Sequence, residues 1–179
     1  VMKIIMDPVA GDNITARGSG NFQVSFYNKG DFRMFGNYIV DQGMYKLSMK
    51  EIIHKDFALK SGSTVTFTGD PYYANLDVQA VYTVNSASLS DLSTDASLTQ
   101  STVKVNCLMN LTGSLANPTI KFDLELPTVN EEDRELVRSA TSTEEQMNTQ
   151  IIYLLGIGKF YAYDYNANSN RSSSATSSL

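Results

Sequence analysis

The chain has 179 residues, with 14 basic and 19 acidic residues and a formal net charge of −5. An acidic chain without a basic run lacks the charge that neutralises nucleic-acid phosphates, so we expect no nucleic-acid partner. The single cysteine, Cys107, excludes an internal disulfide. The length suffices for one domain with a sizeable core, and many Thr, Tyr and Val residues favour an all-β fold.

The first fifty residues predict short strands separated by turns about every ten residues, a spacing typical of all-β folds. We expect strands at 1–6, 13–17, 21–27, 31–40 and 44–49. Asn28-Lys29-Gly30 is a favourable hairpin turn, because Asn and Gly tolerate positive φ. Asp41-Gln42-Gly43 predicts another turn, and Gly36 indicates a bulge or kink inside its strand.

Residues 62–84 give the clearest pattern in the chain. Val65 and Phe67 alternate with threonines, a break follows at Gly69-Asp70-Pro71, and apolar residues such as Leu76 and Val78 then occupy every second position. Strict alternation predicts strands with one apolar and one polar face. The apolar face must therefore be covered by another sheet, a helix or an apolar ligand.

The second half of the chain contains a gap in this pattern and then a change of character. Residues 85–101 are rich in Ser, Asp and Thr and predict a flexible surface loop, and alternating strands resume at 103–111 and 120–126. Asn130 predicts the cap of a first helix. Ser142 with Glu145 forms a capping-box pattern for a second helix that would end at Gly156 and Gly158.

These observations predict three parts. Residues 1–127 form a β domain with the flexible insert at 85–101. Residues 128–165 form a helical segment that ends in the aromatic residues 160–165, and residues 166–179 form a low-complexity polar tail. No apolar run approaches the roughly 20 residues that a membrane-spanning helix needs. The chain begins inside an apolar pattern at Val1, so we interpret it as a fragment from which targeting segments are absent.

Few residues in the chain suggest catalysis. His54 is the only histidine and has no triad partners nearby in sequence. Cys107 occupies an apolar strand position, where a small buried hydrophobe is the simpler interpretation than a reactive thiol. The acidic residues 131–133 suit the positive end of a helix better than a metal site. We therefore expect no enzyme activity, no metal and no cofactor.

The apolar strand faces are the remaining candidate for function. If the strands stack in register, they form one apolar lining. Its members are Phe22, Val24, Phe26, Phe32, Met34, Tyr38, Tyr45, Leu47, Met49, Val65, Phe67, Leu76, Val78, Val105, Met109, Ile120, Phe122 and Leu124. Pattern alone favours a closed sandwich core. The alternative is an open, curved sheet whose apolar face holds acyl chains, each buried methylene contributing roughly 0.8 kcal/mol.

Several segments resemble the C-terminal region of TamB-family proteins. They are GNYIVDQGMYKLSM at 36–49, KDF at 55–57 with GSTVTFTGDP at 62–71, ANLDVQAVY at 74–82, LTGSLANPTIKFDLELP at 111–127 and STEEQMNTQ at 142–150. The resemblance covers about residues 7–165 and is closest to the version found in Bacteroides-type bacteria. The insert at 85–101 and the tail after Asn166 are not among the matching segments.

The resemblance implies a long β-structure folded over like a taco, with an apolar interior and no catalytic residues. TamB-like proteins are anchored in the inner membrane by an N-terminal segment, which this chain lacks, and they span the periplasm. Their C-terminal end meets an outer-membrane barrel of the TamA or BamA type. The implied cargo is phospholipid acyl chains or unfolded β-strands, for lipid transport or for the assembly and secretion of outer-membrane and autotransporter proteins.

Three hypotheses therefore remain from the sequence. The first is a conduit for lipid or nascent strands. The second is a structural or adhesive β-domain with a closed core and no transport role. The third is a docking module that offers an exposed edge strand to a barrel by β-augmentation.

Overall fold

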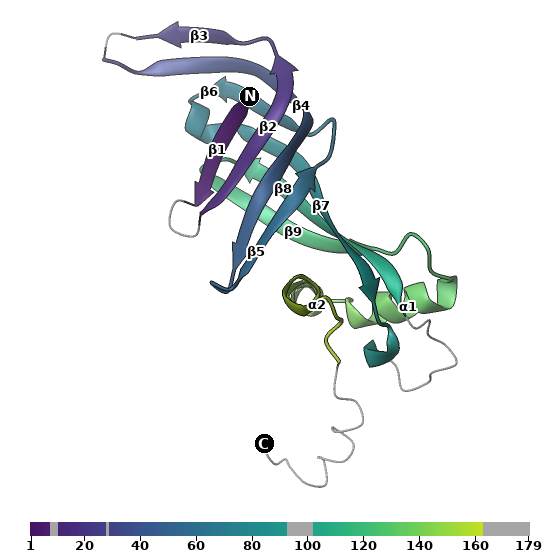
Figure 1. The fold of residues 1–179 in the computed structure, drawn as a ribbon. Coiled ribbons are helices and arrows are strands. Elements are labelled where there is room, and N and C mark those ends of the chain that lie inside the picture. The colour runs from purple at the N-terminus through teal and green to yellow at the C-terminus, as the bar shows by residue number, and fades with distance from the viewer. Residues whose placement is uncertain (8–10, 28, 93–101, 163–179) are drawn as a thin grey trace.

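The computed structural model describes residues 1–7, 11–27, 29–92 and 102–162, which form one nine-stranded antiparallel sheet followed by two helices (Figure 1). The strands are β1 (Met2–Asp7), β2 (Asp12–Gly20), β3 (Gln23–Phe26), β4 (Phe32–Met49), β5 (Ile53–Leu59), β6 (Thr64–Gly69), β7 (Asn75–Ala87), β8 (Val103–Ser114) and β9 (Asn117–Glu125). Single-turn helices η1 (Pro71–Tyr73) and η2 (Ser90–Leu92) flank β7, and α1 (Glu131–Ala140) and α2 (Glu144–Ile157) follow the sheet. The predicted all-β fold with a short helical C-terminal segment is confirmed.

The sheet follows the chain almost in sequence order, as antiparallel hairpins do. Its strands run β1-β2-β4-β5-β7-β8-β9, with β3 paired to the first half of β4 and β6 paired to both β4 and β7. Strand β4 carries β3 and β6 near its beginning and β5 near its end. It therefore joins two regions of the sheet.

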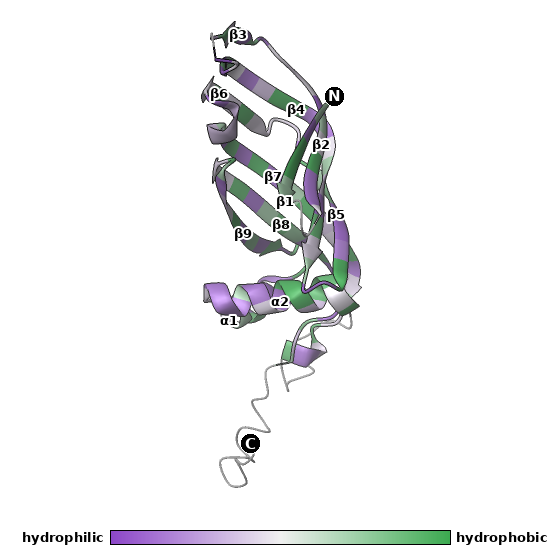
Figure 2. Cartoon of the chain, turned by 90° about the vertical axis from the view of Figure 1, so that its left-hand side faces the viewer, coloured by the Kyte–Doolittle hydropathy of each residue, from purple (hydrophilic) through white to green (hydrophobic). Residues whose placement is uncertain are grey.

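The sheet folds over on itself without closing into a barrel. In a flat sheet, β5 and β9 would lie three strand spacings apart, about 14 Å. The rings of Phe57 on β5 and Phe122 on β9 are instead 6.5 Å apart between centroids. Figure 2 shows the consequence: β1, β2 and β5 form one wall, β7, β8 and β9 form the other, and apolar and polar residues alternate along the strands. The expected curved, amphipathic sheet is confirmed.

The turn predicted at residues 41–43 is wrong, because β4 runs without a break from Phe32 to Met49. The register with β2 shifts there, since Gly18 pairs with Val40 but Arg17 pairs with Gln42. Asp41 is the extra residue of a β-bulge, which sharpens the local twist. A Cβ on Gly43 would come within 2.4 Å of the Thr15 carbonyl oxygen, so the glycine serves close strand approach.

Two other glycine predictions are confirmed. The β3–β4 hairpin closes through a hydrogen bond from the Tyr27 amide to the Asp31 carbonyl at 2.8 Å, and Gly30 has φ +77°. Gly36 has φ +140° within β4, where a Cβ would meet the Asn21 carbonyl oxygen at 2.3 Å. Gly30 suits the left-handed backbone of the turn, and Gly36 leaves no room for a side chain.

The segment expected to be a surface loop is ordered over its first part. Strand β7 continues to Ala87, and Leu89 and Leu92, around η2, are buried. The rest of the predicted loop, 93–101, lies outside the described residues. Leu89 and Leu92 therefore pack into the core, although the segment around them is rich in serine.

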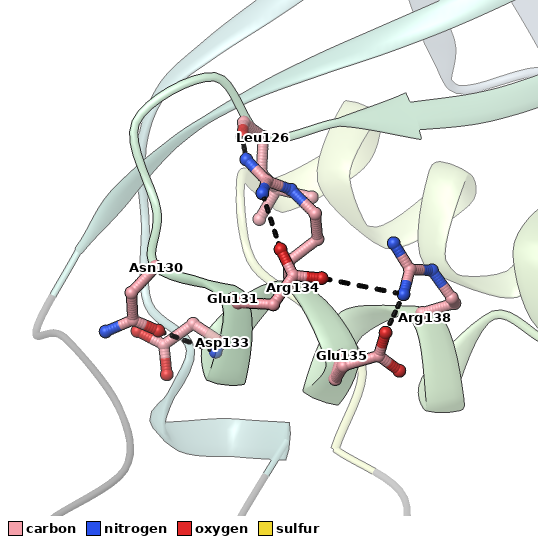
Figure 3. A network of polar contacts seen from close by, with 7 residues as sticks. All are labelled: Leu126, Asn130, Glu131, Asp133, Arg134, Glu135 and Arg138. Carbon is pink, nitrogen blue, oxygen red and sulfur yellow. Dashed lines mark hydrogen bonds and ion pairs between the residues drawn. The ribbon is translucent and has the colours of Figure 1, made fainter.

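Helix α1 begins as predicted and is tied to the end of the sheet (Figure 3). The Asn130 side chain accepts a hydrogen bond from the Asp133 amide at 2.8 Å, satisfying a free helix donor. Arg134 donates to the Leu126 carbonyl at 3.0 Å, just after β9, and pairs with Glu131 at 3.1 Å. These contacts fix the angle at which α1 leaves the sheet.

Helix α2 is capped one residue later than predicted. Thr143, not Ser142, accepts from the Gln146 amide, and the Gln146 side chain reaches back to complete the capping box. Gly158 ends the helix in the left-handed region at φ +70°, which favours glycine. Gly156, expected near the helix end, lies within the last turn.

Helix α2 covers one end of the folded sheet. Ile151, Leu154 and Leu155 are buried, and a Cβ on Gly156 would lie 3.5 Å from the Ile53 side chain on β5. Figure 2 shows both helices lying across the end of the sheet opposite β3. No helix among the described residues is long and apolar enough to cross a membrane.

Candidate functional site: the inner face of the folded sheet

We define the inner face as the side of the sheet that is enclosed by the fold. Strand register shows which side chains lie next to one another on this face. Tyr38 on β4 pairs with Val65 on β6, which pairs with Leu76 on β7, and all three side chains are buried. Side chains at paired positions share one face. The apolar set of each strand therefore contributes to one continuous surface.

The predicted lining residues differ in exposure. Nine are buried: Tyr38, Tyr45, Leu47, Val65, Phe67, Leu76, Val78, Val105 and Met109. Four are partly buried: Met34, Met49, Phe122 and Leu124. Five are exposed: Phe22, Val24, Phe26, Phe32 and Ile120.

The middle of the inner face is filled by its own side chains. Phe57 is fully buried, and its ring lies 5.7 Å from Tyr82 and 6.5 Å from Phe122 between centroids. The two walls contact each other there as in a protein core. The middle thus matches the closed-core interpretation.

One end of the inner face is open. We define the open end as Phe22, Val24, Phe26, Phe32 and Met34, on β3, the preceding turn and the start of β4. Phe26 is 80% exposed and lies 6.0 Å from Phe32 between ring centroids. Figure 1 shows β3 and this part of β4 projecting beyond the other strands. Clustered exposed aromatics of this kind make the open end a candidate binding surface.

Phe22 joins the open end to the buried part of the inner face. Its ring stacks on Tyr38 at 6.4 Å and meets Phe67 edge-on at 5.8 Å. It also covers Gly20 and Gly36, whose missing side chains leave room for the ring. The apolar surface is therefore continuous from exposed to buried.

The last strand, β9, leaves the inner face half covered along one edge. Within the described residues β9 pairs only with β8. Ile120 on β9 is 36% exposed, whereas its partner Leu111 on β8 is fully buried. A strand added at β9 would cover this edge.

Two polar groups on the inner face were not anticipated from the sequence. Asp12 is buried and accepts hydrogen bonds from the Tyr45 hydroxyl at 3.0 Å and the Ser48 amide at 2.8 Å. Lys55 lies in phase with Ile53 and Phe57 on β5, and its ammonium sits 5.6 Å from the Tyr82 ring centroid. Lys55 was detectable from its phase within the alternating strand, but its neighbours across the sheet were not.

The residues weighed for catalysis have other roles in the structure. His54 is exposed, with Nδ1 3.0 Å from the Ser48 hydroxyl. Burial raises the pKa of the Cys107 thiol to about 12, so the thiol is an inert core group at neutral pH. Asp133 is buried in the first turn of α1. Within the described ranges, no three His, Cys, Asp or Glu residues cluster as metal ligands.

Comparison with known proteins identifies a family. No curated protein and no solved structure matches the chain significantly. The model of the TamB C-terminal domain matches residues 3–179, which is nearly the entire sequence. The match agrees with the resemblance carried by the sequence segments and with the folded sheet. The chain belongs to the TamB family and contains its C-terminal domain.

Proposed function

We propose that the open end of the inner face holds apolar cargo, either phospholipid acyl chains or unfolded β-strands. The observation that carries the proposal is the exposure of Val24, Phe26 and Phe32 on the same face as the buried core. Acyl chains gain roughly 0.8 kcal/mol per buried methylene, so such a surface binds lipid without a polar catalytic group.

Membership of the TamB family supports a role for this activity in the cell envelope. TamB proteins are periplasmic, inner-membrane-anchored components of the translocation and assembly module and work with TamA, a BamA-type barrel. We propose that this domain delivers phospholipid to the outer membrane, or supports the assembly and secretion of outer-membrane and autotransporter proteins. An N-terminal anchor outside this chain would hold the protein in the inner membrane.

A matched pair of residues on β4 tests the proposal. Phe32 is 40% exposed on the inner face and Phe35 is 42% exposed on the outer face, where it pairs with Thr68. Glutamate at either position stays accessible to water, so the two variants have similar, small folding costs. We expect Phe32→Glu to abolish cargo binding and envelope function, and Phe35→Glu to leave both near wild type.

The measurement combines binding of a fluorescent phospholipid with complementation of a strain that lacks the protein. Equal activity of the two variants would show that the inner face does not hold cargo. Glutamate at buried positions such as Phe67 or Val78 is not informative, because it would unfold the domain by burying an unpaired charge.

The closed-core alternative rests on the packed middle of the inner face, where Phe57 contacts Phe122. A purely structural or adhesive domain predicts that Phe32→Glu keeps full activity. The docking alternative rests on the half-covered edge at β9. It predicts that a barrel partner is still captured by the Phe32→Glu variant, and it is compatible with a cargo-binding open end.

A further inference from the structure

Lys55 is an unusual residue for its position. Strand β5 places Ile53, Lys55, Phe57 and Leu59 on the inner face, so the ammonium group lies among apolar neighbours. Among the described residues, no carboxylate lies within ion-pairing distance of Lys55, whose ammonium lies over the Tyr82 ring. A half-buried cation without an anionic neighbour is available to an anionic ligand.

A cavity lies beside this lysine. It has a volume of about 640 Å³ and is lined by Lys46, Leu47, Ser48, His54, Lys55 and Tyr82, together with Gly11 and Asp56. Such a volume is in the range of small-molecule sites. The Lys55 ammonium can donate hydrogen bonds to an oxyanion on the inner face, whereas the paired residues Ser48 and His54 line the cavity from the opposite face and contact each other at 3.0 Å.

The cavity is lined from both faces of the β4–β5 pair, and Leu47, Lys55 and Tyr82 line it from the inner face. Strand β5 pairs with β7 only at Ala58 and Leu59, so the two strands separate beside Lys55 and Tyr82. The single carboxylate of the lining, Asp56, stands opposite Lys46 in the β4–β5 register, which leaves Lys55 as excess positive charge. Apolar surface is present in the same cavity through Leu47 and the Tyr82 ring.

We propose that this cavity binds the phosphate ester of a phospholipid headgroup, with Lys55 as the main contact and the lipid's apolar part against Leu47 and Tyr82. The inference rests on the proposed cargo function and specifies phosphate-bearing lipids over neutral ones. It concerns a second position on the inner face, since Leu47 and Phe32 are fifteen residues apart on β4, roughly 50 Å of extended chain.

Three probes distinguish binding of a phospholipid from binding of a free phosphate ester. They are dioctanoylphosphatidylglycerol, dioctanoylglycerol and glycerol 3-phosphate. Binding of each to the 179-residue chain is measured by calorimetry for wild type, Lys55→Met and the control Lys121→Met. Lys121 is an exposed lysine on β9. Methionine keeps the apolar stem of lysine, and circular dichroism verifies the fold.

We expect Lys55→Met to weaken phosphatidylglycerol binding about tenfold, as loss of one charge-assisted contact does, and to leave dioctanoylglycerol binding unchanged. Lys121→Met should bind both lipids as wild type does. Equal phosphatidylglycerol binding by wild type and Lys55→Met would overturn the phosphate site, and the cargo proposal would stand if both lipids still bind. Lys55-dependent binding of glycerol 3-phosphate without binding of either lipid would contradict two proposals. The ligand of this cavity would then not be a lipid, and the cargo of the inner face would not be a lipid either.

Discussion

Cys107 shows how strongly single positions on β8 are desolvated. Its side chain is fully buried between Val105 and Met109 along the same face, and burial alone raises the thiol pKa from 9.0 to about 12. The native state thus holds this proton more tightly than the unfolded chain does. The same environment that makes the thiol inert makes it a probe of folding.

The raised thiol pKa predicts a pH effect on stability. Its contribution is complete below the unfolded pKa near 9 and is lost as pH rises toward 12, by at most about 1.4 kcal/mol per pH unit. Urea unfolding at pH 8 and pH 10.5 should show a steeper loss of unfolding free energy for wild type than for Cys107→Ala, which cannot titrate there. Identical slopes in the two proteins would mean that the thiol is not desolvated.

At the scale of elements, α2 determines where the inner face is closed. Leu154 is 1% exposed against the end of the sheet, whereas Ile157 on the same helix is 65% exposed. Gln150 holds the following segment against the helix, donating to the Tyr161 carbonyl at 3.0 Å and accepting from its amide at 2.8 Å. The helix and this segment together form a cap on the sheet.

Replacing a side chain of α2 by alanine should therefore lower the free energy of unfolding only where that side chain is buried. We expect Leu154→Ala to lower the free energy of unfolding by about 2–5 kcal/mol through loss of packing and a residual cavity. Ile157→Ala should change it by less than about 0.5 kcal/mol, because an exposed side chain loses little contact. Denaturant titration of the two variants measures both values, and equal stabilities would show that α2 does not pack on the sheet.

The elements also show where sequence reasoning succeeds and fails. Alternation located most strands and their faces, because it depends on the chain alone. The single strand β4 was missed because Asp41-Gln42-Gly43 has the composition of a turn, and only the pairing with β2 makes it a bulge. The burial of Leu92 was also missed, because η2 contacts α1, which is distant in sequence.

For the whole molecule, the in-phase apolar faces and the family resemblance predicted a folded sheet with an apolar interior. They did not predict how far the two walls approach each other. That distance is set by side chains such as Phe57 and Phe122, which come from strands that are not neighbours in the sheet. As a result, the lining divides into a packed middle and an open end, a division that periodicity cannot reveal.

The central claim is that cargo contacts the inner face at the open end. The most direct measurement is photocrosslinking in the periplasm with a benzophenone amino acid at position 32 or at position 35, followed by mass spectrometry of the adducts. The two positions have matched exposure on opposite faces of β4. We predict adducts with phospholipid or with unfolded outer-membrane protein at position 32 and none at position 35. Equal adducts at both positions, or adducts at position 35 alone, would contradict the account.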